Sequence, residues 1–245
     1  MKKIIIAFLF AVTPMLVNAS GDVHLDSVDI DMSDKASLQN GARLFVNYCL
    51  SCHSAQYMRY NRMATDLELT DEEVMKNLMF ASEKIGDTMT VAMDKTDAQA
   101  WFGTKVPDLS VTARSRGADW LYTYLRSFYV DSARPWGVNN ATFKDVGMPH
   151  VLWELEGLKK PVYETHKNAE GHEIQSISGY EIAQPGKMNS AEYDKAVRDL
   201  VNFMVYVGEP AKMQRYTLGV WVLIFLAVLF VVAYAMKKEF WKDVH

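Results

Sequence analysis

The chain has 245 residues, of which 49% are hydrophobic and 23% charged, with a formal net charge of −4 and two cysteines. This length allows one medium domain or two small ones, and the hydrophobic fraction is typical of a globular protein. Between Ser20 and Arg215 the charged side chains are 28 acidic and 21 basic, a balance that argues against nucleic-acid binding and suits a basic protein partner.

The N-terminal end has the pattern of an export signal. Two lysines precede an apolar stretch at 4–12, and small residues occupy the positions before a cleavage site after Ala19. A membrane anchor is the alternative, but the stretch is short for a bilayer and Pro14 interrupts it. We therefore predict a signal peptide over residues 1–19.

An amphipathic helix is predicted just before the two cysteines. Leu38, Ala42, Phe45 and Val46 recur at helical spacing and lead directly to the cysteine pair. Gly41 falls inside this helix, where glycine costs up to about 1 kcal/mol relative to alanine. We expect a close backbone contact on that face.

The middle of the chain alternates helices with long insertions. A capping box is predicted at Thr70 and Glu73, and polar residues with glycines at 163–188 suggest a hairpin. A second capping box, Asn189 with Glu192, opens a helix with one apolar stripe. The other predicted elements are an extended acidic segment at 22–34, a loop and an aromatic-rich helix at 104–130, and an ordered loop at 131–150.

The C-terminal end predicts one membrane-spanning helix. Residues 216–236 carry no charge, and at 1.5 Å per residue such a helix is about 31 Å long, which matches the hydrocarbon core. With the export signal, this predicts an exported body over 20–209, an anchor over 210–236 and a cytoplasmic tail over 237–245. The lysines of the tail agree with the positive-inside rule.

The two cysteines and a histidine form the motif Cys49-Leu-Ser-Cys52-His53. A disulfide would close a very small loop, a thioredoxin-like motif would need a βαβ context, and a structural zinc site needs a fourth ligand. Covalent haem attachment uses all three side chains, because two thioethers bind the vinyl groups and the adjacent histidine ligates the iron. The sequence therefore favours haem c.

A low-spin electron carrier needs a sixth iron ligand, and two methionines in loops are the candidates. Met188 stands immediately before the last helix of the body, and Met148 lies in a turn-rich loop. Spacing favours Met188, since a rigid element fixes it, and His150 remains an alternative on chemical grounds.

Several blocks of the sequence resemble the cytochrome c1 family, the haem-c subunits of the cytochrome bc1 complex. They are CLSCHSAQYMRYNRM, VPDLSVTARSRG, FKDVGMPHVLWE and PGKMNSAEYDKAVRDLVNFMVYVGEP, followed by a membrane helix that ends in Tyr-Ala-Met-Lys. A lone haem-attachment motif is common to many cytochromes, but these blocks in this order are specific. Trp101 and Phe102 depart from the family pattern, which often has asparagines there.

The resemblance implies a mainly α fold, a cytochrome-c-like haem domain with long loop insertions and one C-terminal transmembrane helix. It implies one covalent haem c, with Met188 as the sixth iron ligand. It implies an electron-carrier subunit rather than an enzyme on its own, which takes electrons from the Rieske iron–sulfur protein and passes them to cytochrome c, beside cytochrome b in a dimeric complex. The location implied is the bacterial inner membrane, with the haem domain in the periplasm.

The resemblance also assigns further residues to the haem site. Pro107 would accept a hydrogen bond from His53, Leu109 would pack on the haem, and Arg114 and Arg116 would meet a propionate, with Arg116 the stronger match. A membrane-anchored cytochrome c of another reductase or oxidase is the alternative function.

Overall fold

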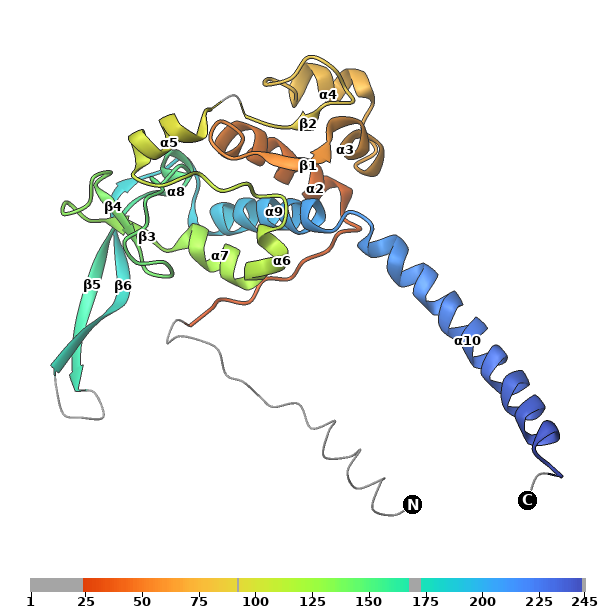
Figure 1. Cartoon of the computed structure of the whole chain (residues 1–245). Coiled ribbons are helices and arrows are strands. Elements are labelled where there is room, and N and C mark those ends of the chain that lie inside the picture. The colour runs from red at the N-terminus through yellow and green to blue at the C-terminus, as the bar shows by residue number, and fades with distance from the viewer. Residues whose placement is uncertain (1–23, 92, 168–172, 244–245) are drawn as a thin grey trace.

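The computed structural model describes residues 24–91, 93–167 and 173–243. The predicted signal peptide lies outside these residues. The body consists of helices with three small antiparallel sheets of two strands each, and one long helix leaves it at the C-terminal end (Figure 1).

The elements follow one another in a chain that alternates short helices with connecting segments. The first half contains α2 (Lys35–Leu44), a π-helix η1 (Phe45–Cys49), β1 (Ala55–Arg59), α3 (Tyr60–Asp66), α4 (Asp71–Asn77), β2 (Thr88–Met89) and α5 (Lys95–Phe102). The second half contains α6 (Thr112–Arg116), α7 (Ala118–Arg126), β3 (Phe128–Val130), β4 (Val138–Asn140), α8 (Trp153–Glu156), β5 (Gly157–Lys167), β6 (Glu173–Pro185), α9 (Ser190–Gly208) and α10 (Lys212–Phe240).

The core is built on the pair α2 and α9, which are far apart in the sequence. Gly41 makes their close approach possible, because a Cβ at this position would lie 2.1 Å from the Asp199 carbonyl oxygen and 2.6 Å from Phe203 Cβ. Asp199 is itself buried and accepts hydrogen bonds from Ser37 Oγ and Asn40 Nδ2, both at 2.8 Å. The close contact expected from the sequence at Gly41 is therefore confirmed, and α9 is its partner.

Both predicted capping boxes are present. The side chains of Thr70 and Glu73 cap α4 reciprocally, and those of Asn189 and Glu192 cap α9. Each box satisfies backbone N–H groups that have no partner inside the first helical turn. α9 then ends at Gly208, shortly before Pro210.

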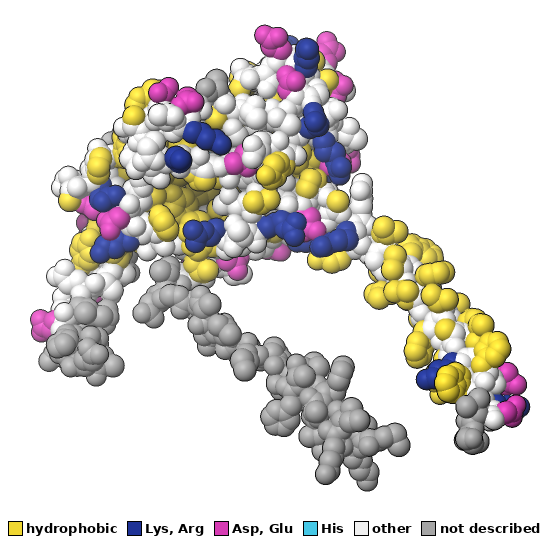
Figure 2. Space-filling model, in the orientation of Figure 1, with side chains coloured by type: hydrophobic (Ala, Val, Ile, Leu, Met, Phe, Trp, Pro, Cys, Tyr) yellow, Lys and Arg dark blue, Asp and Glu magenta, His cyan; other side chains and the backbone are white. Residues whose placement is uncertain are grey.

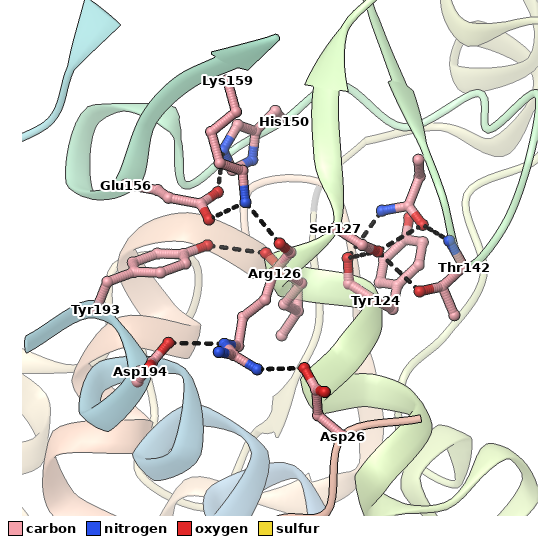
Figure 3. Close-up of polar contacts among 12 residues, drawn as sticks. Asp26, Tyr124, Arg126, Ser127, Thr142, His150, Glu156, Lys159, Tyr193 and Asp194 are labelled. Atoms are coloured by element: carbon pink, nitrogen blue, oxygen red, sulfur yellow. Dashed lines mark hydrogen bonds and ion pairs between the residues drawn. The ribbon is translucent and has the colours of Figure 1, made fainter. Parts of the chain in front are cut away.

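A polar cluster fixes α7 against its neighbours (Figure 3). Arg126 Nε donates to Asp194 of α9 at 2.7 Å, and its Nη1 donates to Asp26 of the extended N-terminal segment at 2.6 Å. Lys159 of β5 donates to the Arg126 carbonyl oxygen at 2.6 Å and pairs with Glu156. These contacts attach the N-terminal segment, β5 and α9 to the helix α7.

The insertion before α9 forms a β-hairpin of β5 and β6 that projects from the body (Figure 1). The strands pair from Gly157 with Pro185 outward to Lys167 with Glu173. The hairpin suggested by the sequence at 163–188 is thus present but starts earlier, and its predicted turn lies outside the described residues.

The uncharged stretch predicted to span the membrane, 216–236, lies within a longer helix. This helix, α10, begins at Lys212 and ends at Phe240. It is the single helix in the described part of the chain that is long and apolar enough to cross a membrane. Hydrophobic side chains cover it on the face visible in Figure 2, and none of its residues is buried against the body. Such an all-round apolar helix is typical of a membrane span.

Candidate haem site

Cys49 ends the π-helix η1, and the chain turns sharply after it. Leu50 N–H donates to the Phe45 carbonyl oxygen, five residues earlier, at 2.9 Å, and His53 N–H donates to the Cys49 carbonyl oxygen at 2.8 Å. A π-turn adds one residue to the helical repeat and is frequent at functional sites. Here it ends the helix and starts the turn that carries both cysteines and the histidine.

Residues 107–110, Pro-Asp-Leu-Ser, lie along the segment that follows the histidine. Leu109 N–H donates to the Ser54 carbonyl oxygen at 2.8 Å. The Asp108 carboxylate accepts from Gln56 N–H at 2.9 Å, and the Ser110 hydroxyl accepts from Tyr57 N–H at 3.1 Å. Asp108, Leu109 and Ser110 therefore bind the chain just beyond the Cys-x-x-Cys-His motif.

The first residue of the block holds the histidine ring. His53 Nδ1 lies 2.8 Å from the Pro107 carbonyl oxygen, and because a carbonyl can only accept, Nδ1 carries the proton. Burial lowers the pKa of His53, which outweighs the opposing effects of this bond and of Asp108. The ring is therefore a neutral imidazole with Nε2 free as a ligand atom, which is the arrangement the resemblance implied.

Both thiols and the histidine line one cavity of about 420 Å³. Cys49 and Cys52 are free thiols rather than a disulfide, and burial raises the pKa of Cys49 to about 12. Most of the lining is apolar, and it includes Leu109, Val106, Trp120, Tyr124, Phe143, Val146, Leu200 and Met204. Among the residues that line this cavity there is no carboxylate.

The two arginines expected at a propionate, Arg114 and Arg116, lie in different places in the structure. Arg116 lines the cavity, with its guanidinium carbon 5.0 Å from the Trp120 ring centroid and 6.0 Å from that of Phe143. Arg114 is absent from the cavity lining, and its Cγ lies 3.3 Å from where a Cβ at Gly208 would stand. Lys105, which the sequence did not single out, is the second cation of the lining.

The candidate sixth ligands also differ in position. Met148 lines the cavity, whereas Met188 is half-buried, packs against the core and is not among the lining residues. Met188 N–H donates to the Leu155 carbonyl oxygen at 3.0 Å, which fixes the residue just ahead of α9. His150 is buried outside the cavity, where its Nε2 lies 3.0 Å from Glu156 Oε2.

Several residues that line the cavity were not expected there from the sequence. Trp120 and Tyr124 are four residues apart on α7 and stack with ring centroids 5.0 Å apart, and helical spacing could have placed both on one face. Phe102, where the family pattern is broken, lines the cavity and lies 5.4 Å from the Trp136 ring. Trp101 beside it is exposed.

These residues fit a covalently attached haem. Two free thiols and a neutral imidazole share an apolar cavity, with cations available for propionates. A structural zinc site fits less well, because within the described ranges no three His, Cys, Asp or Glu side chains are grouped to hold a metal ion. The sulfur and imidazole donors present are those of a c-type haem.

The chain is similar to several known proteins over most of its length. The sequence profile of the Cytochrome C1 family matches residues 28–244. The chain is 48% identical to cytochrome c1 of Allochromatium vinosum, over the whole of both chains. It is 45% identical to a protein of Nitrosomonas europaea named ammonia monooxygenase gamma subunit, over 100% of this chain and 98% of that one. Cytochrome c1 of Rhodospirillum rubrum is 25% identical, over 86% of this chain and 83% of its own.

The profile match covers most of the chain, and the family's proteins bind a covalently attached haem c in the cytochrome bc1 complex. In this chain both cysteines of the motif and the neutral histidine line one cavity. The chain belongs to the cytochrome c1 family.

Proposed function

We propose that the chain relays single electrons from a Rieske iron–sulfur protein to a cytochrome c. The observation that carries this proposal is the His53 Nδ1 to Pro107 carbonyl distance of 2.8 Å, in a cavity that both thiols share. It leaves one imidazole nitrogen available in a fixed orientation, as a redox haem requires. The chain is then an electron carrier and not an enzyme on its own.

Eight residues would hold the haem. Cys49 and Cys52 would form the thioethers, and His53 Nε2 and the Met188 sulfur would ligate the iron. The bound group supplies reversible one-electron chemistry at its iron. Leu109 would pack on the ring, Arg116 would pair with a propionate, and Pro107 would orient His53; Arg114 is assigned to a propionate by the family resemblance alone.

The protein's own contribution is to set the surroundings of the iron. The apolar lining would exclude water from the bound haem, and a thioether ligand together with a histidine would favour a high reduction potential. Both effects suit an acceptor placed after a Rieske cluster, because electrons then move toward the more positive potential.

The sixth ligand can be tested by replacing methionines one at a time. Met188→Leu should abolish the near-infrared methionine-to-iron band of the ferric complex and lower the reduction potential. Met213→Leu, on the exposed part of α10, is the matched control and should leave both unchanged. An unchanged band in Met188→Leu, with loss of the band in Met148→Leu, would assign the ligand to Met148.

The partners proposed are cytochrome b and a Rieske subunit, in a dimeric complex. Purification of the chain in mild detergent should bring both with it, in fixed ratio and at a mass that corresponds to two copies of each. If neither accompanies it, the chain serves another reductase or oxidase as a membrane-anchored cytochrome. The relative named as a monooxygenase subunit makes this the first experiment to perform.

The proposed topology places the signal over 1–19, the exported body over 20–209, the anchor over 210–236 and the tail over 237–245. The apolar helix α10, with Lys237 and Lys238 in its last turn, supports an inward-facing C-terminus. Because both native cysteines would be consumed by haem attachment, a new cysteine reports topology cleanly. Lys76→Cys, at an exposed position of α4 in the body, should react with an impermeant maleimide in intact cells, and Lys242→Cys only after lysis. The reverse pattern would exclude this orientation.

A further inference from the structure

Two methionines compete on chemical grounds for one iron position, and they are held in different ways. Met148 is in the wall of the cavity, whereas Met188 lies behind it, against the core. Met204 also lines the cavity, but it is buried on the core-facing side of α9. A flexible thioether in the cavity wall is a potential ligand, so the structure must contain something that decides between Met148 and Met188.

The loop that carries Met148 is fixed on both sides of that residue. Before it, Arg134 Nη2 donates to the Asp145 carbonyl oxygen at 2.7 Å, and a Cβ at Gly147 would lie 3.1 Å from Thr104 Cγ2. After it, the His150 ring stacks on Phe128 with centroids 4.9 Å apart. The backbone therefore has little freedom, and the position of the sulfur depends on the side-chain torsions.

One group holds that sulfur. The Tyr124 hydroxyl donates to Met148 Sδ at 3.3 Å, and the Tyr124 ring is itself stacked on Trp120 and set edge-on against Phe128. Burial raises the pKa of Tyr124 far above its usual value, so the phenol remains protonated and remains a donor. In the described part of the chain the Met188 sulfur accepts no such hydrogen bond.

We propose that Tyr124 is a positioning residue that holds the Met148 sulfur away from the iron, so that Met188 can serve as the sixth ligand. This inference rests on the proposed function. A sulfur that accepts a hydrogen bond has one lone pair engaged and donates less readily to a metal. It must also give up that bond before the side chain can rotate toward the iron.

The test uses the assembled detergent-purified complex and opens the sixth position first. Met188→Leu should lose the methionine-to-iron band, and its reduced haem should bind carbon monoxide, because Tyr124 still holds Met148. In Met188→Leu with Tyr124→Phe, Met148 is released. The band should return, and the carbon monoxide affinity should fall about fivefold or more, the shift that corresponds to one hydrogen bond of ordinary strength.

Two controls accompany the double variant. Met188→Leu with Tyr122→Phe removes a hydroxyl from the same helix outside the cavity and should behave as Met188→Leu alone. Adding Met148→Leu to the double variant should remove the regained band. All signals are expressed per haem, so a lower yield of assembled complex changes the amount of sample and not the comparison.

Two results would overturn the inference, and they differ in what they leave standing. If Met188→Leu exposes the iron and Tyr124→Phe restores nothing, Tyr124 does not control Met148, while the Met188 assignment survives. If Met188→Leu keeps its band and Met148→Leu loses it, Met148 is the ligand, and both the inference and the assignment of Met188 fail.

Discussion

Glu154 and Glu156, both on the short helix α8, differ in their exposure to solvent. Glu156 and its partner Lys159 have side chains only 10% and 11% exposed, and Glu156 also faces His150 (Figure 3). Glu154 and its partner Lys187 are 45% and 68% exposed. A buried charge that loses its partner is strongly destabilising, whereas exposed ion pairs contribute little.

We therefore expect Glu156→Gln to lower the stability of the body by about 3 kcal/mol, because Lys159 would keep a buried charge without a counter-ion. Glu154→Gln, the matched control, should cost about 0–1 kcal/mol. Thermal unfolding of the full chain, followed by loss of the helical circular dichroism signal, measures both. Equal melting temperatures for the two variants would show that the contacts of Glu156 with Lys159 and His150 do not stabilise the body.

At the scale of elements, the packing of α2 on α9 places the haem-attachment turn. η1 continues directly from α2, so any shift of α2 moves Cys49 and the residues after it. At Gly41 the two helices approach so closely that an added Cβ would overlap α9. The site therefore depends on a contact that lies two helical turns away from it.

Gly41→Ala should destabilise the body by at least about 1–3 kcal/mol, since an added Cβ would overlap the Asp199 carbonyl oxygen and overpacked sites cost this much. The fraction of chains that carry haem should fall as well. Gly86→Ala is the control, because a Cβ there meets nothing within 4 Å. Unfolding temperature and haem content per chain are the measurements, and an unchanged haem content would separate α2 packing from haem attachment.

The capping box of α4 gives this helix a pH-dependent stability. The Thr70 N–H and hydroxyl both donate to the Glu73 carboxylate, and these bonds lower the pKa of Glu73 below 4.5. A carboxylate with a depressed pKa contributes stability that is fully present above its unfolded pKa, and it is lost as the pH falls through the folded pKa.

Wild type should therefore melt at a higher temperature than Glu73→Gln at neutral pH, and the gap should close in buffers well below pH 4.5. Glu72→Gln, in the same turn but outside the capping box, should show no such pH-dependent gap. Melting curves at several pH values measure the difference in melting temperature between wild type and each variant. A gap that persists in acid would mean that the charge of Glu73 is not what stabilises the cap.

At the scale of the whole molecule, the acidic and basic side chains are interspersed on the surface visible in Figure 2, while the body as a whole is acidic. The body carries 28 acidic and 21 basic side chains between Ser20 and Arg215. The lining of the cavity has the opposite character, with Lys105 and Arg116 as its charged residues. Attraction of a basic partner would therefore come from the outer surface of the body.

Electron transfer from the reduced complex to a basic cytochrome c should slow as salt rises, because the Debye length falls from about 10 Å at 0.1 M to about 3 Å at 1 M. An acidic cytochrome c should show a flat or rising dependence. Stopped-flow oxidation of the haem over this range of ionic strength measures both. A rate that is equal for the two acceptors and insensitive to salt would contradict docking by charge.

The sequence by itself determined the local features, because they depend on neighbouring residues. The Cys-x-x-Cys-His motif, the two capping boxes and the apolar C-terminal helix each depend on a short stretch of sequence, and the structure contains each of them. The resemblance to a family added Pro107, whose carbonyl does lie beside His53. The assignments of the haem ligands stay predictions.

Only the tertiary structure decided which distant residues meet at the site. Arg114 and Arg116 are two residues apart, yet Arg116 alone of the pair reaches the cavity, because the short helix α6 turns Arg114 toward the end of α9. Trp120, Tyr124 and Lys105 also line the cavity, and their place there is likewise decided by the packing of distant segments. Helical spacing could place Trp120 and Tyr124 on one face of α7, but it cannot indicate what that face meets. This depends on how α6 and α7 pack against α9 and on where the loop of Met148 is fixed.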